Sequence, residues 1–154
     1  MARLEVGAKA PFFTLTNQIG DEVALADFAG RRLVLYFYPA DDTPGCTREA
    51  CQFNDELGAF EELGVAVLGV SPDPPDTHVA FRTKYGLGFD LLSDPDKAVM
   101  AKYGAYGEKM LYGKAVVGVI RSTFVLGPTR RIEHAWYAPR TDGHAARVLK
   151  ALEG

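Results

Sequence analysis

The chain contains two cysteines, Cys46 and Cys51, and both lie in the short stretch DDTPGCTREAC. Paired cysteines can form a structural disulfide, bind a metal ion or carry out redox chemistry. The N-terminal stretch MARLEVGAKAPFF has basic residues but no continuous apolar run before a small-residue cleavage site, so we expect no secretory signal and a cytoplasmic location. A reducing compartment disfavours a permanent disulfide, so this pair is more typical of metal binding or redox chemistry.

The residues around Cys46 predict that it lies in the first turn of a helix. Pro44 suits the first helical position, because its fixed φ and missing N–H cost nothing there, and Thr43 suits the N-cap. Unpaired N–H groups and the positive end of the helix dipole favour the thiolate form of a cysteine at this place, which makes the sulfur a nucleophile. A buried, inert cysteine that packs as a small apolar residue is the alternative.

Arg121 interrupts the stretch VGVIRSTFVL, which otherwise predicts a strand that is buried on both faces. Burial of a guanidinium is costly unless an anion or a polar substrate lies beside it. A thiolate at Cys46 would meet this need. On the sequence alone, an edge-strand arginine whose head group reaches solvent explains the pattern equally well.

Pro39, Thr43 and Cys46 form the pattern P-x-x-x-T-x-x-C, and together with the distant Arg121 this pattern resembles the peroxiredoxins. The stretches YFYPADDTPGCTREACQFND and GEKMLYGKAVVGVIRSTFVL are similar to the bacterioferritin comigratory protein or Q class of that family. The resemblance extends from GAKAPFFTL to the final helical segment. One visible departure is Tyr106, which stands where the class pattern GVWGEK has tryptophan; we expect no effect on the chemistry.

The resemblance implies a role for each residue of the pattern. Cys46 would be the peroxidatic cysteine of an antioxidant thiol peroxidase, which attacks hydrogen peroxide or an organic hydroperoxide and becomes a sulfenic acid. Cys51 would be the resolving cysteine, which condenses with Cys46 to a disulfide bond that a thioredoxin- or glutaredoxin-type donor reduces. Thr43 would bind the peroxide, Pro39 would shield the thiolate, and Arg121 would polarise both thiolate and peroxide. The resemblance implies no cofactor, no metal, and a monomer or weak dimer.

Alternation of strand and helix patterns predicts the architecture. The elements expected from periodicity and from their Gly and Pro boundaries are a hairpin within 12–30, strands at 32–39, 65–73 and 89–95, helices at 44–63, 74–86, 95–104 and 142–154, an irregular segment at 104–118, and a hairpin across 127–129. Such alternation favours parallel crossovers, and the late hairpin adds antiparallel strands. We therefore predict an α/β, thioredoxin-like fold, with a central mixed β-sheet flanked by helices and an added N-terminal β-hairpin.

Length and composition predict one globular domain over residues 1–154. The chain has 47% hydrophobic and 24% charged residues, which is typical of a globular protein. A formal net charge of −3 gives no field that would attract nucleic acid or an anionic membrane. No segment approaches the roughly 18 apolar residues of a membrane span, so we expect neither nucleic acid nor membrane as a partner.

Other functions fit these residues less well. A thioredoxin-like dithiol oxidoreductase would need a C-x-x-C motif, whereas four residues separate Cys46 from Cys51. The three histidines, His78, His134 and His144, are scattered, and none has metal-ligand spacing from either cysteine. A non-catalytic binding module that senses oxidation would need a reactive thiol but has no evident use for a buried guanidinium.

Three acidic residues lie close to Cys46 in the sequence. Asp41 and Asp42 could be read as a pair of catalytic carboxylates, but adjacent residues in a loop usually diverge, and a turn is the better interpretation. Glu49 lies one helical turn beyond Cys46 and could position an arginine or a backbone amide. We expect it instead to be a solvated charge on the helix surface.

Overall fold

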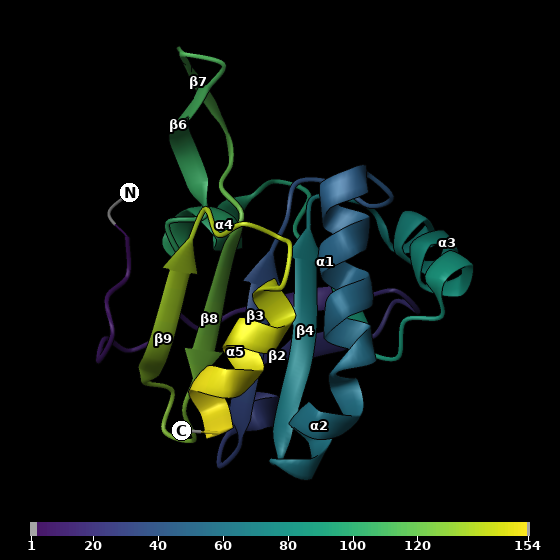
Figure 1. Ribbon diagram of the computed structural model, residues 1–154, viewed down its shortest axis with the longest axis vertical. Helices are drawn as coiled ribbons and strands as arrows, with labels where there is room; N and C mark the ends of the chain where they lie inside the picture. The colour runs from purple at the N-terminus through teal and green to yellow at the C-terminus, as the bar shows by residue number, and fades with distance from the viewer. Residues whose placement is uncertain (1–2, 154) are drawn as a thin grey trace.

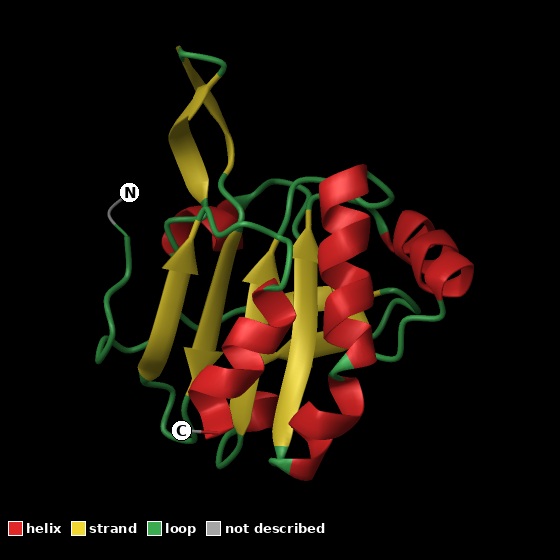
Figure 2. Ribbon diagram, in the orientation of Figure 1, coloured by secondary structure: helices red, strands yellow, loops and turns green. Residues whose placement is uncertain are grey.

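The structure is a computed structural model that describes residues 3–153. Seven strands form one sheet in the order β2-β1-β5-β4-β3-β8-β9 (Figures 1 and 2). The strands of this sheet are β1 (Thr14–Asn17), β2 (Glu22–Ala24), β3 (Arg32–Phe37), β4 (Val65–Ser71), β5 (Asp90–Ser93), β8 (Ser122–Leu126) and β9 (Ile132–Tyr137). Two further strands, β6 (Tyr106–Leu111) and β7 (Lys114–Val119), pair only with each other.

Helices connect the strands of the sheet. They are α1 (Pro44–Asp55), α2 (Leu57–Glu62), α3 (Pro75–Tyr85), α4 (Ala98–Lys102), α5 (His144–Glu153) and the 3-10 helix η1 (Leu25–Phe28). The predicted boundaries of α3 are confirmed, because Pro75 begins it and Gly86, at a left-handed φ of 64°, ends it. None of the described helices has the length and apolar character needed to cross a membrane.

The pairing makes the sheet mixed, as predicted. β4 pairs in parallel with both β3 and β5, and these pairs require the crossovers that α1–α2 and α3 provide. β8 runs antiparallel to β3 and to β9. β1 and β2 form the predicted N-terminal hairpin, which joins the sheet through β5.

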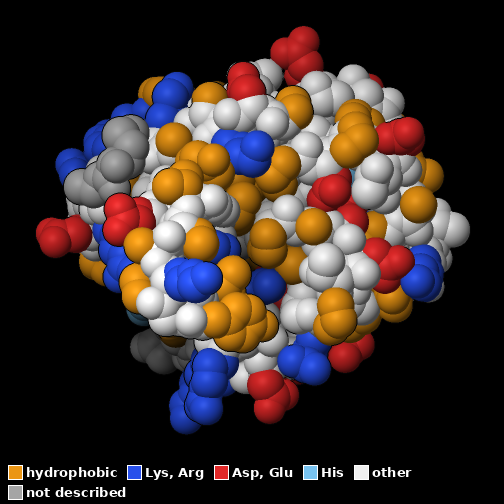
Figure 3. Space-filling model, turned by 90° about the horizontal axis from the view of Figure 1, so that it is seen from above, with side chains coloured by type: hydrophobic (Ala, Val, Ile, Leu, Met, Phe, Trp, Pro, Cys, Tyr) orange, Lys and Arg blue, Asp and Glu red, His pale blue; other side chains and the backbone are white. Residues whose placement is uncertain are grey.

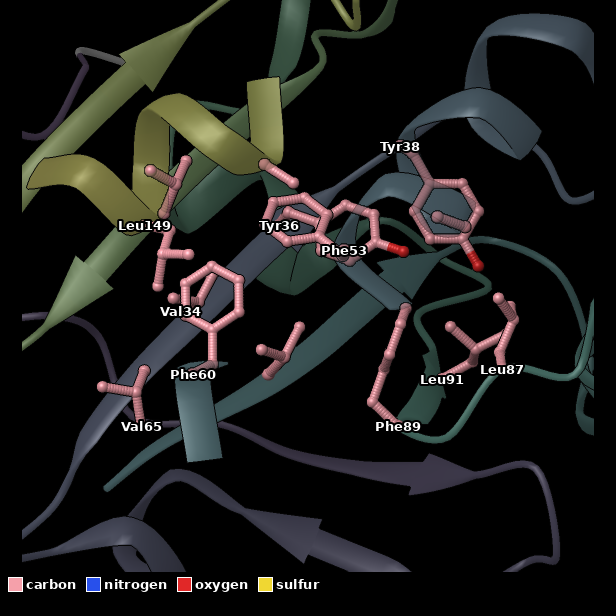
Figure 4. Close-up of a cluster of buried hydrophobic side chains, with 14 of the residues drawn as sticks. Val34, Tyr36, Tyr38, Phe53, Phe60, Val65, Leu87, Phe89, Leu91 and Leu149 are labelled. Atoms are coloured by element: carbon pink, nitrogen blue, oxygen red, sulfur yellow. The ribbon is translucent and has the colours of Figure 1, made fainter. Parts of the chain in front are cut away.

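Helices cover both faces of the sheet, which explains why its central strands are apolar without alternation. Figure 1 shows α1 and α5 in front of the sheet and α4 behind it. Alternate residues of β3 therefore enter two cores: Val34 and Tyr36 pack on the α1 and α5 side, whereas Leu33 and Leu35 pack on the α4 side. Tyr36 stacks on Phe53 of α1 with ring centroids 4.7 Å apart (Figure 4). β3 is thus held from both sides and gives rigid support to the residues that follow it.

The predicted single helix over 44–63 is wrong, because the chain turns at Glu56 and forms α1 and α2 instead. Glu56 has a ψ of 2°, and its N–H donates to both Gln52 O and Asn54 O. The side chain of Asn54 bonds to the backbone of the loop after α3, donating to Gly86 O at 3.1 Å and accepting from Gly88 N at 2.8 Å. This tertiary contact fixes the end of α1, and no local pattern in the sequence indicates it.

The segment 104–118, predicted to be irregular, is largely a regular hairpin. β6 and β7 pair from Tyr106 with Val119 to Leu111 with Lys114, and the hairpin projects beyond the main sheet (Figure 1). Its turn residues Tyr112 and Gly113 have φ values of 52° and 79°, the conformation that a tight two-residue hairpin turn requires. Gly113 therefore serves the turn, and the prediction of an irregular segment is wrong for most of these residues.

Gly69 of β4 provides a test of the packing behind Tyr36. The two residues are opposite each other in the sheet, and a Cβ on Gly69 would lie 2.9 Å from Cζ of Tyr36. We expect Gly69→Ala to lower the free energy of unfolding by about 1–3 kcal/mol, because the stacked aromatic rings cannot yield. Urea unfolding measures this change.

Gly58 in α2 is the matched control. A Cβ there would meet no heavy atom within 4 Å. We expect Gly58→Ala to leave stability unchanged or to raise it by up to about 1 kcal/mol, since alanine favours helix more than glycine does. Equal losses in both variants would contradict the packing that we describe.

Candidate active site

Cys46 lies in the first turn of α1, at the C-terminal end of β3, as predicted. Thr43 is the N-cap residue and Pro44 begins the helix. The side chain of Thr43 makes no capping bond, however, and its hydroxyl donates to Ala40 O at 3.1 Å. Cys46 is only 1% exposed, so the sulfur has little contact with bulk water.

Arg121 contacts Cys46 directly. Its Nη2 donates to the Cys46 Sγ at 3.3 Å and its Nη1 donates to Glu49 Oε1 at 2.7 Å. A Cβ on Gly45 would lie 3.3 Å from the same Nη2, so the absence of a side chain at that position leaves room for the guanidinium. The alternative of an edge-strand arginine is wrong, because β8 lies between β3 and β9, and the guanidinium contacts a sulfur and a carboxylate with only 19% of the side chain exposed.

The prediction that Arg121 lies within a strand is also wrong. β7 ends at Val119 and β8 begins at Ser122, so Arg121 occupies the break between them. The pairing changes partner at this break, because Ile120 N–H donates to Ala105 O whereas Arg121 O accepts from Ala138 N–H. Thr123 and Val125 of β8 face the α1 and α5 side of the sheet, and the Arg121 side chain continues this alternation beyond the start of the strand.

Glu49 is the residue that sequence reasoning placed wrongly. It is 0% exposed, not solvated, and it forms an ion pair with Arg121. A usable signal was present, since Glu49 follows Cys46 by three residues and both must face the same side of α1. Burial raises the pKa of Glu49 to about 7, although the charge and the hydrogen bond of Arg121 oppose this shift.

Arg121 keeps its positive charge in this setting. Burial by itself would lower the pKa of Arg121, but the Glu49 carboxylate and the Cys46 sulfur outweigh it and raise the pKa above its ordinary value. One buried cation thus has two acidic neighbours on the same helix. Two anions side by side repel each other. The anionic form of Glu49 or of Cys46 is therefore more stable when the other group is neutral.

Cys51 lies further along α1, and both cysteines are free thiols. Burial, with a smaller effect from the Asp55 carboxylate, raises the pKa of Cys51. In a regular helix, residues five apart have Cα atoms about 8–9 Å from each other, whereas a disulfide needs about 7 Å or less. Because α1 is continuous from Pro44 to Asp55, the two sulfurs cannot bond while it is intact.

Comparison with known proteins identifies the family. The model of the AhpC/TSA family matches residues 6–135. A putative peroxiredoxin of Mycobacterium tuberculosis is 52% identical over 150 residues, which cover 97% of this chain and 96% of that protein. The chain belongs to the AhpC/TSA family and is a peroxiredoxin. Peroxiredoxin Bcp of Escherichia coli is 40% identical over 153 residues, covering 99% of this chain and 98% of the relative.

Solved structures agree with this assignment. The bacterioferritin comigratory protein of Xanthomonas campestris has a TM-score of 0.89 at 42% identity, and a PrxQ mutant of Xylella fastidiosa has 0.92 at 37% identity. Both matches cover 99% of this chain and 98% of the other. The predicted thioredoxin-like fold and the predicted class are therefore confirmed. As a peroxiredoxin the chain is a thiol peroxidase, which takes a peroxide as substrate and a thiol as reductant.

The other residues of the predicted site are placed as follows. Pro39 is exposed in the turn between β3 and α1, and its shielding of the Cys46 sulfur stays a prediction. Tyr106 is half-buried at the start of β6 and packs against the core on the α4 side. Among residues 3–153, no group of three or more His, Cys, Asp and Glu side chains is arranged to hold a metal ion.

A groove runs from Arg121 along the base of the β6–β7 hairpin. It has a volume of about 520 Å³, and its walls include Met110, Val119, Ile120 and Pro139. Figure 3 looks down on this end of the peroxiredoxin and shows hydrophobic side chains gathered around a hollow, with basic side chains beside it. The charged residues Arg3, Glu108 and Lys109 also line the groove, so it is apolar only in part. A groove that has an apolar wall and a guanidinium at one end suits a ligand with one polar end and one apolar end.

The raised pKa of Glu49 predicts a pH dependence of stability. Its pKa rises from 4.5 to about 7 on folding, so the stability linked to this group is full below about pH 4.5 and is lost as the pH rises through 7. We expect wild type to lose about 1–3 kcal/mol relative to Glu49→Gln between pH 5 and pH 8.

Urea unfolding of both proteins across this pH range measures the difference, and groups common to the two proteins cancel in it. The glutamine of the variant cannot ionise. Its altered hydrogen bonding and packing add an offset to the free energy of unfolding, and this offset does not vary with pH. A difference that stays constant with pH would show that the Glu49 carboxylate has an ordinary pKa.

Proposed function

We propose that this peroxiredoxin reduces hydrogen peroxide and organic hydroperoxides through Cys46, that Cys51 resolves the product as an intramolecular disulfide, and that a cytoplasmic thioredoxin- or glutaredoxin-type donor regenerates both thiols. The observation that carries the proposal is the Arg121 guanidinium, which bonds the Cys46 sulfur at 3.3 Å. A thiolate needs such a partner in a site with 1% exposure.

The chemistry is a two-electron transfer from sulfur to the peroxide. The Cys46 thiolate attacks one peroxide oxygen, an S–O bond forms, and the O–O bond breaks. The departing oxygen takes a proton and leaves as water or an alcohol, and Cys46 is left as a sulfenic acid. The Cys51 sulfur then displaces the sulfenic oxygen as water, and a disulfide forms.

Three kinds of group can stabilise the charge that moves during attack. The guanidinium of Arg121 lies beside the sulfur, and the free N–H groups of the first turn of α1 point towards the same space. The Thr43 hydroxyl donates its proton to Ala40 O, so its oxygen remains able to accept the O–H of a hydroperoxide. These donors and this acceptor would orient the peroxide with one oxygen at the sulfur.

The groove at Arg121 supports activity on organic hydroperoxides as well as hydrogen peroxide. Its apolar walls would receive the organic substituent, while the peroxide group lies at the guanidinium. The solved Xanthomonas campestris protein is described in terms of its alkyl peroxide reduction activity. The same substrate class suits the groove of this chain.

Replacement of Cys46 by serine tests the nucleophile. We expect Cys46→Ser to abolish peroxide consumption in the presence of a thiol reductant, because a hydroxyl cannot supply the thiolate. Cys51→Ser should still consume one equivalent of peroxide per chain in a single turnover. Turnover that survives in Cys46→Ser would exclude this residue as the site of attack.

Replacement of Arg121 tests the charge donor. We expect Arg121→Ala to slow peroxide reduction by about 100-fold or more, since one preorganised donor is typically worth that much. Arg32→Ala is the matched control: Arg32 forms a 3.0 Å surface ion pair with Glu133 at the other end of β3, and its loss should leave the rate within about two-fold. Equal rates in the two variants would remove Arg121 from the mechanism.

The proposed disulfide formation requires α1 to unwind at its start, which Gly45 makes less costly. We expect amide hydrogen exchange over residues 43–54 to increase after one equivalent of peroxide, while mass spectrometry confirms a Cys46–Cys51 bond. The Cys51→Ser variant, oxidised in the same way, should keep the protection of the reduced form. Unchanged protection together with a confirmed bond would contradict the intact helix described here.

A further inference from the structure

His78 of α3 is a buried histidine outside the groups used above. Its side chain is 0% exposed, and both ring nitrogens have a partner. Nδ1 lies 2.6 Å from Asp41 Oδ2, and Nε2 lies 3.0 Å from the carbonyl oxygen of Leu92. Asp41, whose side chain is only 1% exposed, comes five residues before Cys46. The aspartate that the sequence assigns to a turn therefore belongs to a buried polar cluster.

The hydrogen-bond partners of His78 show how many protons the His78 ring and the Asp41 carboxyl group carry between them. A carbonyl oxygen can only accept, so Nε2 must carry a proton towards Leu92. The short contact between Nδ1 and Asp41 needs a second proton, which can sit on the ring or on the carboxyl group. A proton on the ring leaves Asp41 as a carboxylate, which can accept a hydrogen bond at each of its two oxygens.

Tyr38 favours the same arrangement. Its hydroxyl donates to the other oxygen of Asp41, Oδ1, at 2.5 Å, and a carboxylate accepts such a bond better than a neutral acid does. Burial, followed by the charges of Tyr36 and Asp41, raises the pKa of Tyr38 well above its ordinary value, so the phenol remains a donor. Asp41 is thus the anion of a buried pair.

The cluster also fixes the backbone at Asp41. Its N–H donates to Asp73 Oδ2 at 2.8 Å, and the same oxygen accepts the hydroxyl of Ser71 at 2.6 Å. Residue 41 is therefore attached to the end of β3 through Tyr38, to α3 through His78, and to the segment after β4 through Asp73. Only Asp42 separates this attachment from the N-cap of α1.

We infer that Asp41 and His78 form a buried ion pair that positions the start of α1, and with it Cys46, for attack on peroxide. Both are positioning residues, because they act on the reacting sulfur through the chain that joins them to it. The pair holds the upstream end of the segment while residues 43–54 unwind and refold. This role rests on the proposed function, whereas the ion pair itself does not.

Nitrogen-15 NMR of the full-length protein at neutral pH tests the ion pair. We expect both ring nitrogens of His78 to have protons and imidazolium-type shifts. His144 is an internal control, because burial, aided by Arg147 and Arg121, lowers its pKa to about 4 and keeps its ring neutral. A pyridine-type, unprotonated Nδ1 in His78 would overturn the ion pair.

Asp41→Asn and Asp42→Asn test the positioning role as a matched pair. Asp42 is exposed, pairs with Lys84 at 2.8 Å, and has a left-handed φ of 59° that asparagine also tolerates. We expect Asp41→Asn to slow the oxidation of Cys46 by about ten-fold or more without slowing disulfide formation, because a small misplacement affects attack most. Asp42→Asn should leave both rates within about two-fold. Rapid quenching with mass spectrometry measures the two steps separately.

An unchanged oxidation rate in Asp41→Asn, or an equal loss in both variants, would overturn the positioning role. Where Asp41→Asn does not fold, His78→Gln, which keeps a hydrogen-bond donor but carries no charge, is measured in the same way. If the wild-type protein consumes no peroxide, the proposed function fails, and the His78 spectrum still decides whether the buried ion pair exists.

Discussion

The buried guanidinium of Arg121 is the interaction on which the rest of the site depends. A charge that is largely removed from water must have anionic or polar partners, and here they are Cys46 and Glu49 of one helix. To bring them together, the first turn of α1 must meet the break between β7 and β8. The sheet satisfies this condition, because β3 leads into α1 and β8 is the antiparallel neighbour of β3.

Two demands on α1 oppose each other. In the mechanism that we propose, attack on peroxide uses the intact first turn, in which the Cys46 sulfur lies at the guanidinium. The proposed disulfide formation uses an unwound turn, because the intact helix holds the two cysteines too far apart. The start of α1 is built for this exchange, since the Thr43 side chain does not cap it and Gly45 adds flexibility. The rest of α1 is secured by Phe53, which is fully buried against Tyr36.

The surroundings of α1 would limit how far the proposed unwinding spreads. Upstream, Asp41 is attached to three separate elements through Tyr38, His78 and Asp73. Downstream, Asn54 bonds to the loop after α3. A mobile segment between two fixed points can return to its starting position after each cycle, which a multi-turnover thiol peroxidase requires. Glu49 adds a further interaction at the start of α1, because its carboxylate and the Cys46 sulfur both bind the guanidinium of Arg121.

Local spacing, periodicity and one motif were enough to predict the fold class, the N-terminal hairpin, the helix start at Pro44 and the choice of Cys46 and Arg121. The burial of Glu49, the end of α1 at Asn54, the position of Arg121 between two strands and the pairing of Asp41 with His78 became known only from the folded chain. These features join residues 32 to 75 positions apart. A periodic pattern in the sequence indicates which face of a helix or strand a residue lies on. The residue that contacts that face depends on how distant segments of the chain pack together.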